Sequence, residues 1–353
     1  MGQAEQEATR VRARSLCTIL PPLILRAEPM ENTTQLLLRQ SDALAGRNVL
    51  VVDANDPALK TLAVDATVHV HADDYTIGAQ QWSPAPTVPE GTDLLVLPLP
   101  KSIDRLRFLL NWLAGEITAP TELWLVGPAK GGIRGALKYL DAHVDASVLE
   151  DSARHCKLYS GLLQPGEKQS LKAWGTVLEV ADQEAISYPG VFSHGRLDEG
   201  SALLLAAMES HTLGKPGKVI DMGCGAGVIS VWLARHGWQV QGVDVSASAV
   251  AASTESLARN GLQGRIMGGD LFSPIQGRVD MVVTNPPFHD RRQRTTDITR
   301  RLIADAPKHL KSGGVLWLVA NRELPYVQWL DDAFSHVQVA SETTRFRVYR
   351  AVL

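Results

Sequence analysis

The stretch V-I-D-M-G-C-G-A-G-V, residues 219–228, predicts a short buried strand that turns directly into a helix. Two β-branched residues lead into Asp221, and the helix is expected to begin near Val228. Glycine at every second position after the carboxylate permits a tight turn and removes the Cβ atoms that would keep a ligand from the backbone. The turn therefore predicts a ligand site whose contacts are Asp221, Gly223, Gly225 and Gly227.

A second carboxylate follows the next predicted strand, Gln239–Val243. Asp244 lies 23 residues beyond Asp221 (244 − 221), close to the spacing at which a carboxylate accepts hydrogen bonds from ribose hydroxyls. A dinucleotide pattern G-x-G-x-x-G would need a glycine where Val228 stands, so no pyrophosphate cradle is predicted. The acidic-x-G-x-G-x-G form instead resembles the first motif of class I S-adenosylmethionine-dependent methyltransferases. That resemblance implies that Asp221 faces the positively charged methionine part of the cofactor.

Length and composition predict a globular protein of two ordinary domains. The chain has 353 residues, of which 45% are hydrophobic and 21% charged. A formal net charge of −3 excludes a generally basic nucleic-acid binder, so contacts with RNA must come from local clusters. The three cysteines form no C-x-x-C pair and have no histidine at metal spacing, which indicates a reduced cytoplasmic setting with no metal: Cys17, Cys156 and Cys224.

Residues 1–30 precede the first domain. Three arginines come before an apolar run, Leu16–Leu25, that contains two prolines and is far shorter than the roughly 18 residues that cross a membrane. Met30 begins a plausible alternative start. We therefore expect a disordered extension or a mis-assigned start codon, with no membrane association.

Strand and helix patterns alternate through the first half, which predicts an α/β fold with a parallel sheet. The first strand ends V-V-D-A-N-D-P, without the glycines found in the second half. We therefore predict two tandem class I methyltransferase-like (Rossmann-like) domains. Residues 31–185 form a degenerate scaffold and RNA-docking domain, and residues 186–353 form the catalytic domain. The expected elements of the first half are the strands from Asn48, Thr67–Asp74, Asp93–Pro100 and Glu122–Gly127 and the helix Ile103–Ala114.

The tetrapeptide N-P-P-F, residues 285–288, follows a fourth strand, Arg278–Thr284. Two prolines stiffen the backbone, so the Pro286 carbonyl points in a set direction. That carbonyl and the Asn285 side-chain oxygen accept both N–H groups of an amine, while Phe288 stacks on the ring that carries it. Neither a metal nor a covalent nucleophile is required. The motif predicts methylation of an amino group but does not separate adenine N6, guanine N2 and glutamine amide.

Two further segments are predicted to contact the cofactor. The motif G-G-D-L-F, residues 268–272, places Asp270 and Leu271 at the end of a third strand, where Asp270 can hydrogen-bond the adenine amino group. The polar segment Tyr188–Gly200 can fold over the cofactor as a lid, with Phe192 in contact, and a helix is expected from about Ser201. His194 in this segment is more typical of a hydrogen-bonded loop residue than of a catalytic base.

Two basic clusters are candidates for RNA contact. The glycine-rich loop P-A-K-G-G-I-R-G carries Lys130 and Arg134, and the run after His289-Asp290 carries Arg291, Arg292 and Arg294. Both can bind rRNA phosphates, and both are also compatible with ordinary solvated surface charge.

Several motifs together resemble the small-subunit ribosomal RNA (guanine-N2)-methyltransferases of the C type, over roughly residues 31–353. They are Y-P-G-V-F-S-H-G-R-L-D-E-G-S-A-L-L-L, D-M-G-C-G-A-G-V, T-N-P-P-F-H-D, L-V-A-N and F-R-V-Y-R-A. The resemblance implies methylation of guanosine 1207 of 16S rRNA at N2, with S-adenosylmethionine as cofactor and the assembled 30S subunit as substrate. It carries cofactor roles onto Asp221, Gly223, Gly225, Asp244 and Asp270, and the target amine onto Asn285, Pro286 and Phe288. The run after Asp290 departs from the family, because a glycine is usual there.

We therefore predict a cytoplasmic, monomeric rRNA (guanine-N2)-methyltransferase. Three alternatives stay open. A sister family acts on guanine in large-subunit rRNA, and the motif V-A-N-R, residues 319–322, slightly favours that family. A glutamine-amide protein methyltransferase shares the N-P-P motif. A non-catalytic ribosome-assembly factor could retain the fold alone.

Overall fold

The computed structural model describes residues 30–180, 182–286, 292–323 and 326–353, except for the side chains of residues 292–295. Glu31–Leu353 form one compact unit. Residues 1–29 of the predicted N-terminal extension lie outside the described residues, as do Phe288, His289 and Arg291, and so do the side chains of Arg292 and Arg294.

The first half contains a seven-stranded sheet in the order β3-β2-β1-β4-β5-β7-β6. The strands β1 to β5 pair in parallel, and β7 runs antiparallel to its neighbours. The predicted strand Thr67–Asp74 ends at Ala72, which leaves the last two predicted residues in a loop. The strands are β1 Asn48–Val51, β2 Thr67–Ala72, β3 Gln81–Trp82, β4 Leu94–Pro98, β5 Thr121–Pro128, β6 Val144–Ala153 and β7 Cys156–Leu163.

Successive side chains along these strands point to opposite faces of the sheet, and both faces are buried, as is usual for a parallel sheet. Leu50 and Leu95 face α3 and α4, whereas Val49 and Val96 pack on the opposite face with α1. In the helix predicted from Ile103, the leucines at helical spacing are all fully buried: Leu106, Leu109, Leu110 and Leu113. The helices are α1 Asn32–Leu38, α2 Ser41–Leu44, α3 Ile103–Glu116 and α4 Ile133–Leu140, with short 3-10 turns η1 Pro57–Thr61, η2 Tyr75–Ile77 and η3 Leu171–Trp174.

The second half repeats this topology strand for strand. Its sheet has the order β12-β11-β10-β13-β14-β16-β15, in which only β16 is antiparallel. The repeated order confirms the prediction of two tandem α/β domains of one fold. The strands are β10 Lys218–Met222, β11 Gln239–Asp244, β12 Arg265–Gly268, β13 Val279–Thr284, β14 Leu310–Asn321, β15 His336–Glu342 and β16 Phe346–Val352.

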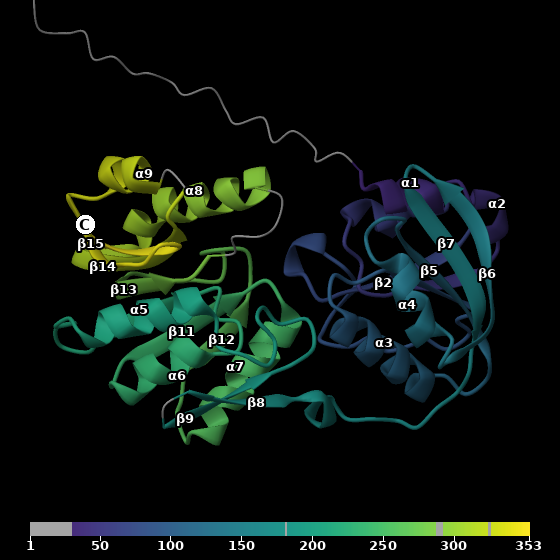
Figure 1. The fold of residues 1–353 in the computed structure, drawn as a ribbon, viewed down its shortest axis with the longest axis horizontal. Coiled ribbons are helices and arrows are strands. Elements are labelled where there is room, and N and C mark those ends of the chain that lie inside the picture. The colour runs from purple at the N-terminus through teal and green to yellow at the C-terminus, as the bar shows by residue number, and fades with distance from the viewer. Residues whose placement is uncertain (1–29, 181, 287–291, 324–325) are drawn as a thin grey trace, which may run out of the picture. The chain divides into compact units, whose positions relative to one another are not determined.

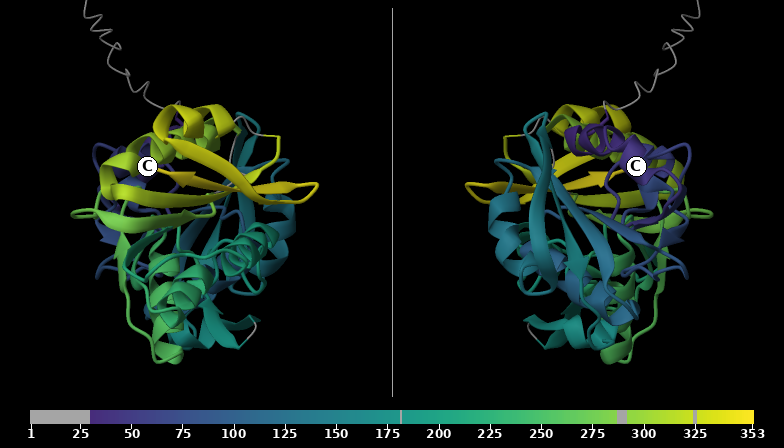
Figure 2. Two further views of the ribbon diagram at one scale, coloured as in Figure 1. Left: turned by 90° about the vertical axis from the view of Figure 1, so that its left-hand side faces the viewer. Right: turned by 90° about the vertical axis from the view of Figure 1, so that its right-hand side faces the viewer.

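Helices cover both faces of the second sheet (Figures 1 and 2). On one face lie α5 Glu199–Glu209, α6 Val228–Arg235 and α7 Ala247–Arg259, and on the other lie α8 Arg292–His309 and α9 Tyr326–Ala333. The strand order reverses between β10 and β13, so the crevice at their carboxyl ends is where an open α/β sheet binds ligands.

A two-stranded hairpin precedes the second sheet. It consists of β8 Thr176–Val180 and β9 Gln183–Ser187, and the predicted boundary at residue 185 lies within β9. The helix predicted from Ser201 begins earlier, at Glu199, because the Asp198 carboxylate caps it by accepting the Ser201 N–H at 3.0 Å.

Candidate functional site

Asp221 lies near the carboxyl end of β10 and is completely buried. Its Oδ2 accepts a hydrogen bond from Ser230 Oγ at 2.6 Å, but Oδ1 has no partner among the described residues. Burial raises the pKa of Asp221 to about 7; the Ser230 hydrogen bond opposes this shift and the charge of Asp244 adds to it. A buried carboxylate with an unused oxygen is a site for a cation.

The glycine turn has the geometry that its sequence predicted. Gly223, Gly225 and Gly227 have φ of 76°, 53° and 81°, a left-handed conformation that other residues adopt only with strain. A Cβ on Gly227 would lie 2.8 Å from Ser253 Cα in α7. Glycine is therefore needed here both for the turn and for the close approach of α6 to α7.

Asp244 ends β11 and is half-buried. One carboxylate oxygen accepts the Gly225 N–H and the other accepts the Ser246 N–H, both at 2.9 Å. Burial raises the pKa of Asp244 to about 6; its backbone hydrogen bonds oppose this shift, and Asp73 and Asp74 of the first half add to it. Each oxygen keeps a lone pair for a further donor, which suits the two hydroxyls of a ribose.

The first half holds the loop that follows Asp244. The Asp73 carboxylate accepts Ser246 Oγ at 2.6 Å, Ser248 N at 2.8 Å and Ser248 Oγ at 2.6 Å. Asp73 thus adds a second N-terminal cap to α7, whose N-cap residue is Ser246. These bonds join residues 173 and 175 positions apart in the chain, so no local sequence pattern could have predicted them.

Trp82, in β3, contacts both this loop and the end of β12, the strand next to β11. Its indole N–H donates to the Asp73 carbonyl at 2.9 Å and the Val245 carbonyl at 3.1 Å. The ring packs directly on Gly268, since an added Cβ there would lie 2.1 Å from the indole. Trp82 therefore supports the ends of both β11 and β12, a role that sequence reasoning missed.

Arg105 pairs with the carboxylate that follows the central strand of the first half, whereas the carboxylate at the corresponding place in the second half, Asp221, has no such partner among the described residues. The Arg105 guanidinium is almost wholly buried and donates to Asp53 Oδ1 at 2.7 Å, just beyond the carboxyl end of β1. It also donates to the Pro84 carbonyl at 2.7 Å, the Pro189 carbonyl at 3.3 Å and Ser248 Oγ at 3.3 Å. Burial alone would raise the pKa of Asp53, but the charge and hydrogen bond of Arg105 outweigh burial and lower it. In this half, an internal cation neutralises the carboxylate at the end of the central strand.

Asn285 follows β13 and lies against α5. Its Nδ2 donates to Asp198 Oδ2 and to Ser201 Oγ, both at 2.8 Å. Its Oδ1 is buried and has no hydrogen-bond partner in the described part of the chain. The Thr284 hydroxyl donates to the Met222 carbonyl at 2.9 Å, which ties this corner to the strand that carries Asp221.

Comparison with known proteins agrees with this geometry. The family model "Methyltransferase small domain" matches residues 182–350, and "Methyltransferase small domain N-terminal" matches residues 34–176. The ribosomal RNA small subunit methyltransferase C of Alcanivorax borkumensis is 93% identical over 324 residues, which are 92% of this chain and 100% of that protein. The chain belongs to the ribosomal RNA small subunit methyltransferase C family. The family resemblance stated from the sequence motifs is thereby confirmed.

Two further relatives fit the family. The protein of the same description from Cronobacter sakazakii is 41% identical, over 74% of this chain and 76% of that protein. The solved structure of the T. thermophilus 16S rRNA N2 G1207 methyltransferase, in complex with AdoMet and guanosine, matches with a TM-score of 0.79 and 23% identity. That match covers 93% of each chain, so the shared fold includes both halves.

The other residues that were predicted to contact cofactor or RNA follow β12, precede α5 or follow β5. Asp270 forms an ion pair with Arg301 at 2.9 Å, and Leu271 is buried with a φ of 48°. Phe192 is 51% exposed. The Lys130 and Arg134 side chains are exposed on the loop and helix after β5.

His194 has the structural role that its sequence context favours. Its Nδ1 lies 2.8 Å from Ser187 Oγ and its Nε2 lies 3.5 Å from Thr176 Oγ1. Burial lowers the pKa of His194. The ring joins the loop to the β8–β9 hairpin.

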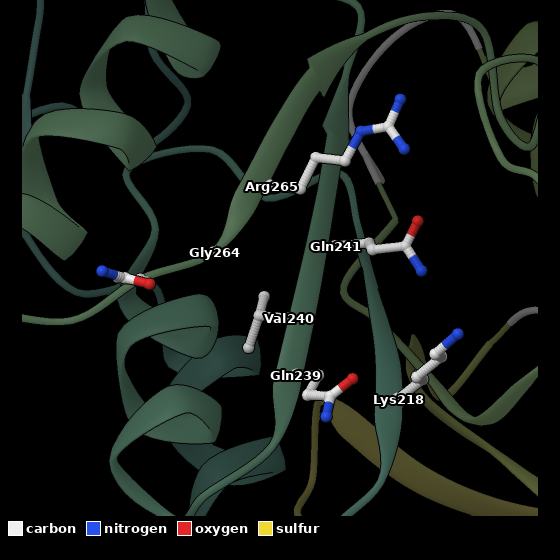
Figure 3. Close-up of a pocket in the computed structure, with 7 residues that line it drawn as sticks. Lys218, Gln239, Val240, Gln241, Gly264 and Arg265 are labelled. Atoms are coloured by element: carbon white, nitrogen blue, oxygen red, sulfur yellow. The ribbon is translucent and has the colours of Figure 1, made fainter.

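An open groove of about 400 Å³ lies away from this site (Figure 3). Its polar side chains come from residues at or near the starts of β10, β11 and β12, at the edge of the sheet opposite the glycine turn. It is lined by Lys218, Gln239, Val240, Gln241, Gln263, Gly264 and Arg265.

The described ranges offer neither a metal cluster nor a membrane span. Within them, no three His, Cys, Asp or Glu side chains are grouped as metal ligands. None of the helices in the described part of the chain has the length and apolar character that crossing a bilayer requires.

Proposed function

We propose that this chain transfers the methyl group of S-adenosylmethionine to the exocyclic N2 of a guanosine in 16S rRNA, at the position that the family resemblance gives as 1207. The substrate is the 30S subunit and the setting is the cytoplasm. Membership of the small subunit methyltransferase C family supports the activity. One observation carries the site assignment: both Asn285 amide hydrogens are bound by protein, while its buried Oδ1 is left for a donor.

The glycine turn and the two carboxylates beside it, Asp221 and Asp244, suit S-adenosylmethionine as a ligand. The unpartnered Asp221 Oδ1 suits the ammonium group of the cofactor, and the Asp244 carboxylate suits the ribose hydroxyls. The left-handed glycines bring backbone close to the ligand without a Cβ in the way. We assign Phe192, Asp270 and Leu271 to the adenine and lid side of the same site. When bound, the cofactor supplies an electrophilic methyl group.

Asn285 and Pro286 orient the target amine. The guanine amino nitrogen is a poor nucleophile because its lone pair is conjugated with the ring. The Asn285 Oδ1 and the Pro286 carbonyl each accept one N–H, which favours a pyramidal nitrogen with its lone pair directed at the methyl group. As positive charge develops on the nitrogen, both acceptors stabilise it. We assign ring stacking to Phe288.

We propose that residues 31–185 dock RNA and residues 186–353 carry out the reaction in a monomer that needs no metal. Lys130 and Arg134 are exposed cations that can bind phosphate. Removing one cation that binds a phosphate should reduce the slope of log affinity against log salt by about one. Lys130→Glu with Arg134→Glu should therefore weaken binding to 30S subunits and flatten the slope. The control Lys215→Glu changes an exposed cation that precedes β10 in the second half and should do neither.

The catalytic assignment is tested by tritium transfer from labelled S-adenosylmethionine to isolated 30S subunits, 50S subunits and a release factor. We expect label in 16S rRNA with the natural chain and about a hundredfold less with Asn285→Ala, at unchanged cofactor affinity. Equal labelling by the variant contradicts the role of Asn285. Label in 50S subunits identifies the large-subunit alternative, and label in a release factor identifies the glutamine-amide alternative. Cofactor binding that is undetectable by calorimetry identifies a non-catalytic assembly factor.

A further inference from the structure

We propose that Asp198 is a positioning residue that fixes the orientation of the Asn285 side chain, so that its oxygen and not its nitrogen faces the target amine. This inference rests on the proposed function, because it assigns a task to a residue beside the same site. The observation behind it is the hydrogen bond from Asn285 Nδ2 to Asp198 Oδ2 at 2.8 Å.

The chemistry of the two groups allows only one orientation. A carboxylate accepts hydrogen bonds and cannot donate, whereas a carboxamide has an accepting oxygen and a donating nitrogen. Rotating the Asn285 amide by half a turn would bring its oxygen against the Asp198 oxygen, which would set two acceptors against each other in a partly buried place. The Ser201 hydroxyl, which also lies 2.8 Å from Nδ2, can accept or donate and so does not decide the orientation alone.

Asp198 is itself held rigidly. The oxygen that binds Asn285 also accepts the Ser201 N–H at 3.0 Å, as the N-cap of α5. That helix is anchored in the core by Leu204 and Met208, both 0% exposed. Because the core fixes this helix, its N-cap carboxylate is held in a fixed position beside Asn285 at the end of β13.

Gly200 supplies an independent indication that this contact is closely fitted. It occupies the first turn of α5, where alanine would favour the helix by about 1 kcal/mol. A Cβ at this position would lie 2.9 Å from Asp198 Oδ2 and 3.3 Å from Asn285 Oδ1. The φ of Gly200 is not in the left-handed region, so its backbone conformation does not require glycine. Space for the Asp198–Asn285 contact does require it.

The decisive variant is Asp198→Asn, which keeps the size and the helix-capping ability of the side chain but adds a donor. The Asn285 amide is then free to bind in either orientation, and a donor facing the amine offers no acceptor. We expect the single-turnover rate of methyl transfer to 30S subunits to fall 10- to 100-fold. Cofactor affinity, KM for subunits and melting temperature should stay within about twofold or two degrees of the natural chain. Asp56→Asn makes the same change at another N-cap, that of η1, and should leave the rate unaltered.

Gly200→Ala tests the same contact without altering its chemistry. A purely structural view predicts an equally active or more stable protein, because alanine is the better helix former. The positioning role predicts a rate at least tenfold lower at natural cofactor affinity, while the helix propensity of alanine and its close contact with Asp198 have opposite effects on the melting temperature. A natural rate in both variants overturns the proposal, as does a loss of rate that is matched by loss of cofactor affinity in either variant or by loss of stability in Asp198→Asn. If the natural chain itself transfers no methyl group to 30S subunits, the proposed function fails instead, which keeps the two failures distinct.

Discussion

Replacing Asp221 by asparagine should make the ligand-free protein more stable and the cofactor complex much weaker. The opposing signs follow from one feature, a completely buried carboxyl whose pKa burial raises to about 7, from an ordinary value of 3.8. A carboxyl with a raised pKa contributes stability below its unfolded pKa and loses it as pH rises through the folded value. The ligand-free protein should therefore lose stability between about pH 4 and pH 8, and Asp221→Asn should remove much of this loss.

The magnitude follows from the size of the shift. A difference of about three pKa units corresponds to roughly 4 kcal/mol at pH 8, with no discount for screening because Asp221 is 0% exposed. Asparagine puts an unpaired N–H where Oδ1 was, at a cost of about 1–3 kcal/mol. The net gain expected at pH 8 is about 1–3 kcal/mol, or several degrees in melting temperature. At pH 5 the carboxyl is protonated in the folded state, so the gain should vanish.

Cofactor binding should change in the opposite direction. Losing a charge-assisted hydrogen bond weakens affinity about 10- to 100-fold at pH 7. In the natural chain the ionised fraction of a group with pKa of about 7 drops from one half at pH 7 to about one hundredth at pH 5. With the neutral carboxyl binding as weakly as asparagine, affinity should fall about 10- to 30-fold over that interval, and the asparagine variant should show a shallower fall, set by Asp244 alone.

The assays are thermal unfolding from pH 5 to pH 8 and titration calorimetry with S-adenosylhomocysteine over the same range. A variant that is less stable than the natural chain at pH 8 would refute the argument from burial. Equal affinities at pH 7 would refute the assignment of Asp221 to the cofactor.

Other predictions concern the supports of the site. Trp82→Ala should lower cofactor affinity about tenfold by calorimetry, because the indole packs on Gly268 and holds the ends of two strands; unchanged affinity would exclude a role for the first half in this site. Gly227→Ala should cost about 1–3 kcal/mol more in chemical unfolding than Gly214→Ala. Both glycines have left-handed φ, 81° and 79°, but only the Gly227 Cβ would meet Ser253; similar costs would show that the approach of α6 to α7 is not tightly packed.

The sequence predicted the parts of the site that depend on strand ends. Asp221, Asp244 and Asn285 each occur where an apolar strand stops, and parallel topology brings those ends to one edge of the sheet. The glycine turn was predictable for the same reason, since left-handed geometry has a direct sequence signature.

The supporting contacts could not be predicted, because they join distant segments. Asn285 and Asp198 are 87 residues apart, and Asp73 and Ser246 are 173 apart. Asp73 was expected within a strand, but β2 ends at Ala72 and leaves it in the loop that caps α7. A strand pattern gives no information about a side chain whose partner lies in the other domain.

The most direct test of the central claim is a crystal structure of the chain with S-adenosylmethionine or a stable analogue and guanosine. We expect the cofactor ammonium within hydrogen-bond distance of Asp221 Oδ1, and the guanine N2 within hydrogen-bond distance of Asn285 Oδ1. Cofactor bound elsewhere, or a guanine amine facing away from Asn285 while the cofactor is in place, would contradict the claim.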